Sequence, residues 1–222
     1  MRGLLVHALV VGRPGFRLGP LDLNLKPGAL LAVIGPNGSG KTTLLKTLAG
    51  LIPPLSGRVD AGAKAYLPPP GSVQAEFSTR HIVALGRAGR VRWAADLSAT
   101  DHAAAEAALD RMGLAGMADK PFDRLSSGQQ QRALFARMIV QDASVCLLDE
   151  PLALLDPAQA RAVAAAVRDL REEGRTVLVS THDLAWAATA GQVLALGAQP
   201  RLGTPEALLT PEAVARLYDP AQ

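Results

Sequence analysis

The sequence predicts an α/β fold, in which a parallel β-sheet is flanked by helices, and three observations support this prediction. Short, wholly apolar runs alternate with helical patterns near the start of the chain and again from Val145 onward, which is typical of parallel strands that are buried on both faces. A glycine-rich loop joins one of these apolar runs directly to a helical pattern. The region between has few strand signals, so it predicts a helical insertion.

Local composition places the individual elements. Residues 1–34 are interpreted as short strands, because Gly/Pro turns at 12–15 and 26–28 divide them. From about 78 to 140, Ala, Leu, Arg and Met recur at helical spacing, and we interpret this stretch as the inserted helices. Buried or short strands are expected at 30–34, 58–59, 65–67, 145–148 and 176–180, and helices at 44–49 and 157–171.

Composition limits the possible functions. Hydrophobic residues make up 49% of the chain, enough for a sizeable core, and the net charge of +3 argues against a dedicated nucleic-acid binder. The single cysteine, Cys146, lies in an apolar run and leaves no disulfide framework, so we expect a reducing compartment. Neither a signal pattern nor an apolar run of membrane-spanning length is present. We therefore expect a soluble protein, or one that reaches a membrane only through a partner.

The glycine-rich loop predicts a nucleotide phosphate site. It follows the strand 30–34, precedes the helix 44–49 and has the spacing G-x-x-x-x-G-K-T. Its glycines let the backbone curl around an anion. The alternative is a glycine-rich turn without a ligand, but such a turn does not need a strand before it and a helix after it. Lys41 is expected to neutralise the β- and γ-phosphates, and the Thr42 hydroxyl to bind Mg²⁺. The predicted nucleotide ligands are Gly35, Pro36, Asn37, Gly38, Ser39, Gly40, Lys41, Thr42 and Thr43.

Two adjacent carboxylates, Asp149 and Glu150, end the apolar run that begins at Val145. Buried carboxylates are costly unless they serve a cation or a reaction. Asp149 is therefore expected to hold Mg²⁺, directly or through water, and Glu150 to polarise an attacking water. If this pair is considered without the glycine-rich loop, the alternative is that it only caps a helix.

A third motif, Leu125–Arg132, has the sequence L-S-S-G-Q-Q-Q-R. Ser126 or Ser127 can cap the helix that follows, which is the structural interpretation. The functional interpretation is a second anion site, because small residues at a helix start leave the N–H groups open to a phosphate.

With these three motifs in this order, the chain resembles the ATP-binding subunits of ABC transporters, from about Leu4 to Tyr218. The resemblance implies that the signature binds the γ-phosphate held by a second subunit, that Asp156 crosses the dimer interface, and that His182 senses the γ-phosphate. The usual signature has glycine where Ser127 stands, a change that should be tolerated at negative φ. The implied signature ligands are Ser126, Ser127, Gly128 and Gln129.

The resemblance also implies an architecture and partners. The expected architecture is a P-loop NTPase (RecA-like) core with a parallel sheet, an N-terminal antiparallel β-subdomain and an inserted helical subdomain. The core and β-subdomain would span 1–69 and 141–222, and the helical subdomain 70–140. ATP and Mg²⁺ are the implied cofactors. The implied partners are an identical second subunit, a membrane permease and, indirectly, an extracytoplasmic substrate-binding protein, but no nucleic acid. The implied location is the cytoplasmic face of the bacterial membrane.

Two departures from the family pattern leave questions open. Pro69 stands where the family usually has a glutamine that touches Mg²⁺ and the attacking water, and proline has no side-chain oxygen or N–H donor. Gln74 takes the place of that glutamine if the loop folds back, and otherwise Gln74 is a solvated loop residue. No aromatic residue stands around 11–13 to stack on adenine, so Arg13 or Phe16 would have to reach the base.

The segment Val83–Arg90, followed by Trp93, resembles ATPases of zinc and manganese importers, and iron-siderophore and cobalamin importers share much of this pattern. A metal ion or metal chelate is therefore the expected solute. An exporter, or an importer of another solute, is the alternative within the family. A soluble ABC ATPase is disfavoured because this chain has one ATPase unit, no heptads and little net charge. A non-hydrolysing regulatory subunit is disfavoured because the chain has all four of Lys41, Asp149, Glu150 and His182.

Overall fold

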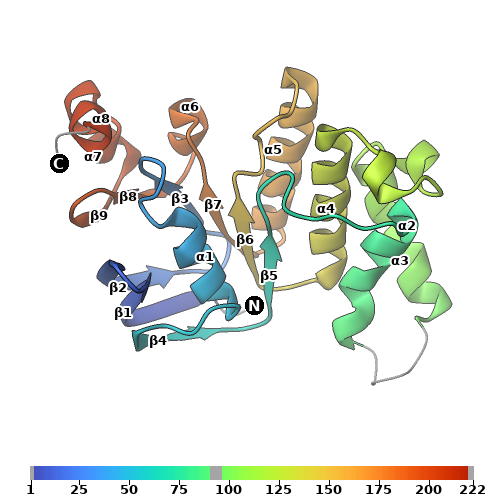
Figure 1. The fold of residues 1–222 in the computed structure, drawn as a ribbon, viewed down its shortest axis with the longest axis horizontal. Helices are drawn as coiled ribbons and strands as arrows, with labels where there is room; N and C mark the ends of the chain where they lie inside the picture. The colour runs from blue at the N-terminus through green and yellow to red at the C-terminus, as the bar shows by residue number, and fades with distance from the viewer. Residues whose placement is uncertain (1–2, 91–96, 220–222) are drawn as a thin grey trace. The chain divides into compact units, whose positions relative to one another are not determined.

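The computed structural model describes residues 3–90 and 97–219 (Figure 1). Two compact units make up the chain, and each is described by itself. The first comprises Met1–Tyr66, Ser144–Glu150 and Arg168–Gln222, and the second Leu67–Ala143 and Pro151–Val167. The subdomain limits expected from the sequence, 70–140 for the helical part, stay a prediction.

The first unit begins with a small antiparallel sheet of the order β2-β1-β4. Its strands are β1 (Leu4–Arg13), β2 (Phe16–Leu25) and β4 (Ser56–Ala61). The strands β1 and β2 are ten residues long, so they are longer than the short strands expected from the sequence. Much of each strand alternates between buried and exposed residues, which is the pattern of a sheet with one face on the core.

The main sheet has the order β5-β6-β7-β3-β8-β9 in the described part of the chain. Pairing is parallel between β6 and β7, between β7 and β3 and between β3 and β8, but β9 runs antiparallel to β8. All residues of the central strands β3, β6 and β7 are buried, which explains why these strands are mainly apolar, with polar residues only at the ends of β6 and β7. The strands are β3 (Leu30–Ile34), β5 (Lys64–Leu67), β6 (Val145–Asp149), β7 (Thr176–Ser180), β8 (Gln192–Leu196) and β9 (Pro200–Gly203).

Both sheets of this unit share one hydrophobic core with helix α1 (Lys41–Ala49). Leu44, Leu45 and Leu48 of α1 are fully buried in it, beside leucines and valines of β1, β2 and β3. The later helices are α5 (Pro157–Glu172), which runs from the second unit into the first, α6 (Leu184–Ala187), α7 (Pro205–Leu208) and α8 (Pro211–Tyr218). This core fixes the carboxyl end of β3 and the start of α1, where the glycine-rich loop lies.

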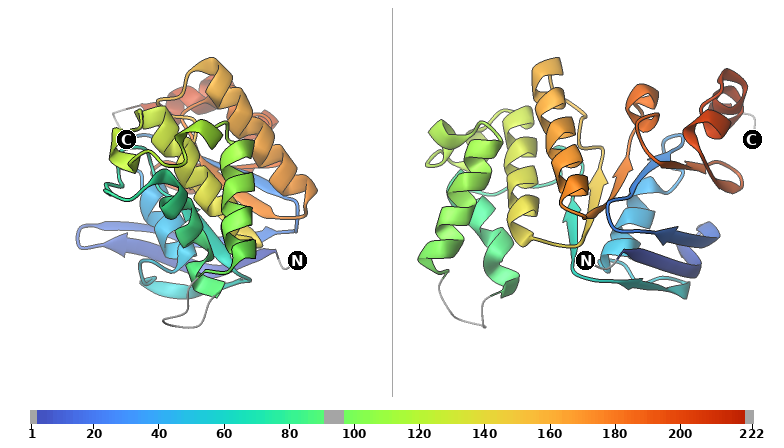
Figure 2. Two further views of the ribbon diagram at one scale, coloured as in Figure 1. Left: turned by 90° about the vertical axis from the view of Figure 1, so that its right-hand side faces the viewer. Right: turned by 180° about the vertical axis from the view of Figure 1, so that it is seen from behind.

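The second unit is built from helices that pack on one another, as the green to yellow-green segments of Figure 2 show. Phe122 and Phe135 are fully buried at its centre, and Ser98 and Ser126 each begin a helix with a capping box. The elements are α2 (Thr79–Ala84), η1 (Leu85–Arg90), α3 (Ala99–Arg111), η2 (Ala115–Met117), η3 (Phe122–Arg124) and α4 (Ser127–Gln141). In residues 3–90 and 97–219, every helix is too short or too polar to cross a membrane.

Candidate nucleotide site

The glycine-rich loop lies between β3 and α1, and its backbone requires glycine at two positions. Gly35 has φ +152°, and a Cβ there would lie 2.5 Å from the Leu196 carbonyl oxygen. Gly40 has φ +96°, and a Cβ there would lie 2.4 Å from Cζ of Phe16. Side chains at either position would therefore be both strained and obstructed, which accounts for this glycine spacing without any reference to a ligand.

Lys41 is the first residue of α1, and its ammonium group lies inside the loop. Its Nζ donates hydrogen bonds to the Gly35 carbonyl oxygen at 2.7 Å and to the Pro36 carbonyl oxygen at 3.1 Å. Burial lowers the pKa of Lys41, and the carboxylates of Glu150 and Asp149 act in the opposite direction. Negative charge from those two carboxylates therefore reaches the position that was predicted to contact phosphate.

Two hydroxyl groups of the loop fit an anionic ligand with a cation. The Ser39 Oγ is buried and has no hydrogen-bond partner in the described part of the chain. A buried hydroxyl without a partner is costly, so its presence is consistent with a ligand that completes the site. Thr42 is half-buried one residue after Lys41, at the start of α1, where a hydroxyl group suits a hard cation such as Mg²⁺.

The carboxylate of Asp149 is held at the end of β6 by two hydroxyl groups. Its Oδ1 accepts a hydrogen bond from Ser180 Oγ at 2.6 Å, and its Oδ2 accepts one from Tyr66 Oη at 3.1 Å. Asp149 is only 1% exposed. Burial raises the pKa of Tyr66 well above its ordinary range, with a further contribution from Asp149, so the phenol stays protonated and donates.

Glu150 follows Asp149 in a conformation that side chains rarely adopt, with φ +50°. Its backbone N–H donates to both the hydroxyl and the carbonyl oxygens of Ser180, at 3.0 and 3.2 Å. Its Oε1 lies 2.9 Å from Nε2 of His182, and the two side chains are partly exposed, at 31% and 42%. Left-handed backbone at a bulky residue costs on the order of 1–3 kcal/mol and is concentrated at functional sites.

These groups meet at one edge of the main sheet. The loop follows β3, Asp149 ends β6, and His182 comes two residues after the end of β7. The register places Asp149 opposite Ser180, and Ser180 opposite Val33. The carboxyl ends of parallel strands are where open α/β sheets bind ligands. The edge therefore combines an anion cradle, a fixed carboxylate and a carboxylate–imidazole pair.

Phe16, rather than Arg13, lies at the glycine-rich loop. Besides touching Gly40, Phe16 lines a cavity of about 290 Å³ together with Pro36–Ser39, Leu196–Ala198 and Leu217. Arg13 lies instead in a separate depression beside Pro53 and Pro54. Of the two candidates for a base-stacking residue, the structure brings only Phe16 to the loop.

In the second unit, Ser126 caps α4. Its Oγ accepts from the Gln129 N–H at 3.3 Å, and the Gln129 Oε1 accepts from the Ser126 N–H at 3.0 Å. No described group accepts a hydrogen bond from the N–H of Ser127 or Gly128, and φ at Ser127 is negative. A Cβ at Gly128 would lie 2.5 Å from Oε1 of Gln159, the flexible end of a side chain on α5, so this side chain would have to move to admit a larger residue. The capping role is thus visible, and the anion role stays a prediction.

Asp156 occupies the start of α5. Its Oδ1 accepts hydrogen bonds from the backbone N–H groups of Ala158 and Gln159, at 2.9 and 2.8 Å. Two residues earlier, Leu154 is 69% exposed at φ +62°. An exposed leucine in a strained backbone conformation is typical of an interaction surface, so the segment 153–156 is a candidate contact surface.

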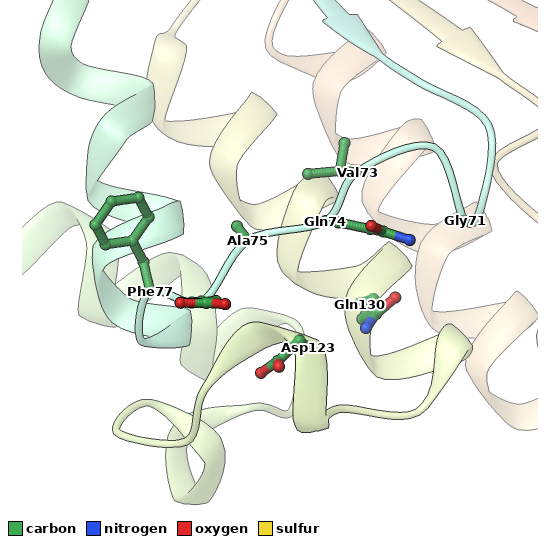
Figure 3. Close-up of a pocket in the computed structure, with 8 residues that line it drawn as sticks. Gly71, Val73, Gln74, Ala75, Phe77, Asp123 and Gln130 are labelled. Atoms are coloured by element: carbon green, nitrogen blue, oxygen red, sulfur yellow. The ribbon is translucent and has the colours of Figure 1, made fainter.

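The loop after β5 contains both Pro69 and Gln74. The Pro69 carbonyl oxygen accepts hydrogen bonds from the N–H and the hydroxyl of Ser72, at 3.4 and 2.6 Å, which closes a turn. Gln74 is exposed and, with Phe77, Asp123 and Gln130, lines a cavity of about 940 Å³ within the second unit (Figure 3). In Figure 3 the Gln74 side chain extends from the loop in the direction of Gly71, and Gln130 is drawn below it.

Sequence reasoning missed two residues of the site, Tyr66 and Ser180. Ser180 is a polar residue at the carboxyl end of β7, directly after three apolar residues, and this position was the available signal. Tyr66 is 83 residues from Asp149 in the chain, and no local pattern links them. Trp93, which contributed to the expected metal-importer resemblance, lies outside the described residues.

Comparisons with known proteins agree with this geometry. A sequence profile described as ABC transporter matches residues 18–153. The manganese transport system ATP-binding protein MntB of Bacillus subtilis is 39% identical over 75% of this chain and 71% of its own length. The hemin import ATP-binding protein HmuV of Nocardia farcinica is 37% identical over 98% of this chain and 81% of its own. A solved metal-chelate type ABC transporter, in an inward-facing conformation, has a TM-score of 0.90 at 31% identity, covering 98% of this chain and 89% of its own.

Proposed function

Because the chain belongs to the ABC transporter family and is an ATP-hydrolysing subunit of an importer, we propose that it powers the import of a metal ion or a metal chelate. The observation that supports ATP as the source of power is the cluster at the carboxyl ends of β3, β6 and β7, where Lys41, Asp149 and the Glu150–His182 pair converge. A cluster of this kind can hold a nucleoside triphosphate and activate water beside it.

We assign the residues of the cluster to four tasks. The loop Gly35–Thr43 cradles the phosphates, with Lys41 leaving its carbonyl partners for the β- and γ-phosphates. Glu150 accepts a proton from the attacking water, and His182, 2.9 Å away, orients that carboxylate and senses the γ-phosphate. Thr42 and Asp149 would hold Mg²⁺, which neutralises charge on the phosphates when it is bound.

We propose that the site is completed by a second copy of the chain. Ser126, Ser127, Gly128 and Gln129 would bind the γ-phosphate held by the partner, using the N–H groups of Ser127 and Gly128. Asp156 binds the start of its own helix through Oδ1, which leaves Oδ2 for another partner, and exposed Leu154 lies two residues before it. Both features support a contact between copies at 153–156.

The relatives support the solute class. Besides MntB, the zinc transport system ATP-binding protein TroB of Treponema pallidum is 35% identical over 75% of this chain. Cobalamin and hemin importers match at similar identity. We therefore propose a divalent transition-metal ion as the solute, with a metal chelate as the second candidate.

An uptake measurement decides between these solutes. Cells in which the chain is deleted are complemented with the wild-type chain or with Glu150→Gln, and the uptake of labelled Mn²⁺, Zn²⁺, cobalamin and hemin is followed. Wild-type chain should restore uptake of one of the ions, and Glu150→Gln should restore none. Restored uptake of an unrelated solute, with no change for the metals, would refute the metal assignment.

We propose that the cavity lined by Val73, Gln74 and Phe77 receives a segment of the permease, which would hold the chain at the cytoplasmic face of the membrane. Phe77 stacks on His81 with ring centroids 4.9 Å apart, yet 57% of Phe77 stays exposed. An exposed aromatic beside a large cavity is typical of an interaction surface.

Replacing Phe77 should uncouple the chain from the permease. Phe77→Asp is expected to leave the basal ATPase rate unchanged and to abolish stimulation in reconstituted transporter, because a charge replaces the exposed anchor. Leu85→Asp is the matched control, since Leu85 is 38% exposed in the same unit but does not line the cavity. Equal loss of stimulation in both variants would argue against this docking site.

Phe16 is expected to stack on the nucleotide base. Phe16→Ala should weaken ATP binding by about 1–3 kcal/mol, roughly tenfold or more, and Phe16→Tyr should keep it. Arg13→Ala is the control, because Arg13 lies in the separate depression. A fluorescent ATP analogue measures both affinities, and a loss confined to Arg13→Ala would reverse the assignment.

A further inference from the structure

We propose that Tyr66 positions the carboxylate of Asp149 for the metal. We also propose that Gln131 of helix α4 holds Tyr66 in place by binding the segment that follows Tyr66. The proposal rests on the function proposed above and adds two residues to its machinery. It starts from the two hydrogen bonds that hold Asp149.

Each oxygen of Asp149 is bound by a hydroxyl from a neighbouring strand. Ser180 Oγ, on β7, lies 2.6 Å from Oδ1, and Tyr66 Oη, on β5, lies 3.1 Å from Oδ2. Two donors on opposite oxygens fix the plane of the carboxylate, and only the remaining lone pairs can face a cation. Ser180 also binds the backbone of Glu150. Among residues 3–90 and 97–219, Asp149 is the hydrogen-bond partner that the Tyr66 hydroxyl has.

The chain directly after Tyr66 has little other means of reaching the carboxylate. Leu67 ends β5, and Pro68, Pro69 and Pro70 follow, without polar side-chain atoms or backbone N–H donors. Three consecutive prolines also fix φ, which makes this segment stiff. Tyr66 is therefore the last residue before the prolines whose side chain can donate to Asp149.

Gln131 anchors the stiff segment at its start. Its Nε2 donates to the Pro68 carbonyl oxygen at 3.4 Å, and the residue is only 1% exposed. The Oε1 of Gln131 is buried and has no partner in the described residues. A buried amide with one unsatisfied oxygen is unfavourable for stability alone. The presence of a buried glutamine at position 131 is explained if its amide positions Pro68.

The two anchors lie two residues apart in the chain. Tyr66 is bound to Asp149 within the first unit, and Pro68 is bound to Gln131 within the second. Gln131 is on α4, which begins at the signature motif. A shift of α4 would therefore be transmitted through Pro68 to Tyr66, and hence to the carboxylate that is proposed to hold Mg²⁺.

The first test removes the hydroxyl alone. Tyr66→Phe keeps the ring that packs on the core, so the protein should fold with an unchanged melting temperature. A hydrogen bond to a charged group corresponds to roughly a tenfold or greater change in an equilibrium constant. We expect the Mg²⁺ concentration for half-maximal binding of a fluorescent ATP analogue to rise about tenfold. Binding measured without Mg²⁺ should not change, nor should KM at saturating Mg²⁺, while kcat falls.

Two further variants test the relay. Gln131→Met keeps the side-chain length and removes the unsatisfied oxygen, and it should shift the Mg²⁺ dependence in the same direction as Tyr66→Phe. If the two residues act through one path, the double variant should be no worse than Tyr66→Phe alone. Pro69→Gln, which offers a side-chain amide in the loop, should lower the Mg²⁺ concentration for half-maximal binding part of the way back when it is combined with Tyr66→Phe.

The outcomes separate this proposal from the proposed function. A wild-type chain that neither binds nor hydrolyses ATP would contradict the proposed function. An active wild-type chain whose Mg²⁺ dependence is unaffected by Tyr66→Phe would overturn the role of Tyr66. Fully additive effects of Tyr66→Phe and Gln131→Met would overturn the relay. A large loss in Gln74→Ala, with none in Tyr66→Phe, would give the positioning role to Gln74.

Discussion

Glu150→Gln should bind ATP like the wild type and lose nearly all turnover. A glutamine can still hydrogen-bond His182, which lies 2.9 Å from the carboxylate, but it cannot accept a proton from water. Removing a general base typically lowers the rate by about 10²–10⁴-fold. Because hydrolysis no longer separates the subunits, we expect an ATP-dependent dimer, detectable by sedimentation velocity.

The control for this variant is Glu212→Gln, which removes an exposed carboxylate in the first turn of α8. It should hydrolyse ATP at the wild-type rate. Both variants should retain the native backbone, because glutamine and glutamate have the same shape and position 150 has a left-handed φ of +50°. Unchanged hydrolysis in Glu150→Gln would remove this residue from the role of base.

The second large effect is expected at Ser126. Ser126→Arg should abolish turnover and spare ATP binding by the single chain, because the bulky side chain blocks the N–H groups of Ser127 and Gly128 from the partner's phosphate. Arginine also removes the helix cap, which is worth about 0.5–2 kcal/mol. A second variant is therefore needed to separate the two effects.

Ser126→Asp provides that separation. Aspartate caps helices as well as serine does and suits the positive end of the helix, so α4 should keep its stability. A carboxylate would nevertheless repel a γ-phosphate, and turnover should be lost. If the role of Ser126 is only to cap α4, Ser126→Asp should be fully active, and that result would refute the anion site.

Mixing two inactive chains tests whether the site is shared between copies. In a mixed head-to-tail dimer of Ser126→Asp and Glu150→Gln, one site combines the intact residues of both chains. Equal mixtures should therefore regain part of the activity that each chain lacks alone, and the wild-type rate should rise more than linearly with protein concentration. Mixtures that stay inactive, with a rate strictly proportional to wild-type concentration, would show that each chain works alone.

The central strands and the glycine-rich loop could be predicted because their signals are local. The runs 30–34 and 176–180 are buried on both faces, so every residue is apolar or small and the limits are sharp. The loop is recognisable because Gly35 and Gly40 satisfy backbone constraints that other residues cannot. By contrast, β1 and β2 alternate between apolar and polar residues and were expected to be shorter than they are.

The contacts around Asp149 could not be predicted, because they depend on register. Pairing of β6 with β7 places Ser180 opposite Asp149, and the hydroxyl of Tyr66 arrives from a strand 83 residues earlier. The left-handed φ of Glu150 likewise has no sequence signal, since glutamate seldom adopts it. These features arise only after the sheet has assembled, and they are the ones that shape the proposed metal site.

The most direct test of the proposed transport role is to purify the tagged chain from its native host at its natural level of expression and identify what comes with it. The account predicts that the chain is recovered with a polytopic membrane protein and that the ATPase rate is stimulated in this complex. A chain that carries Phe77→Asp should show no such stimulation. Recovery without any membrane protein, but bound to ribosomes or DNA, would contradict it.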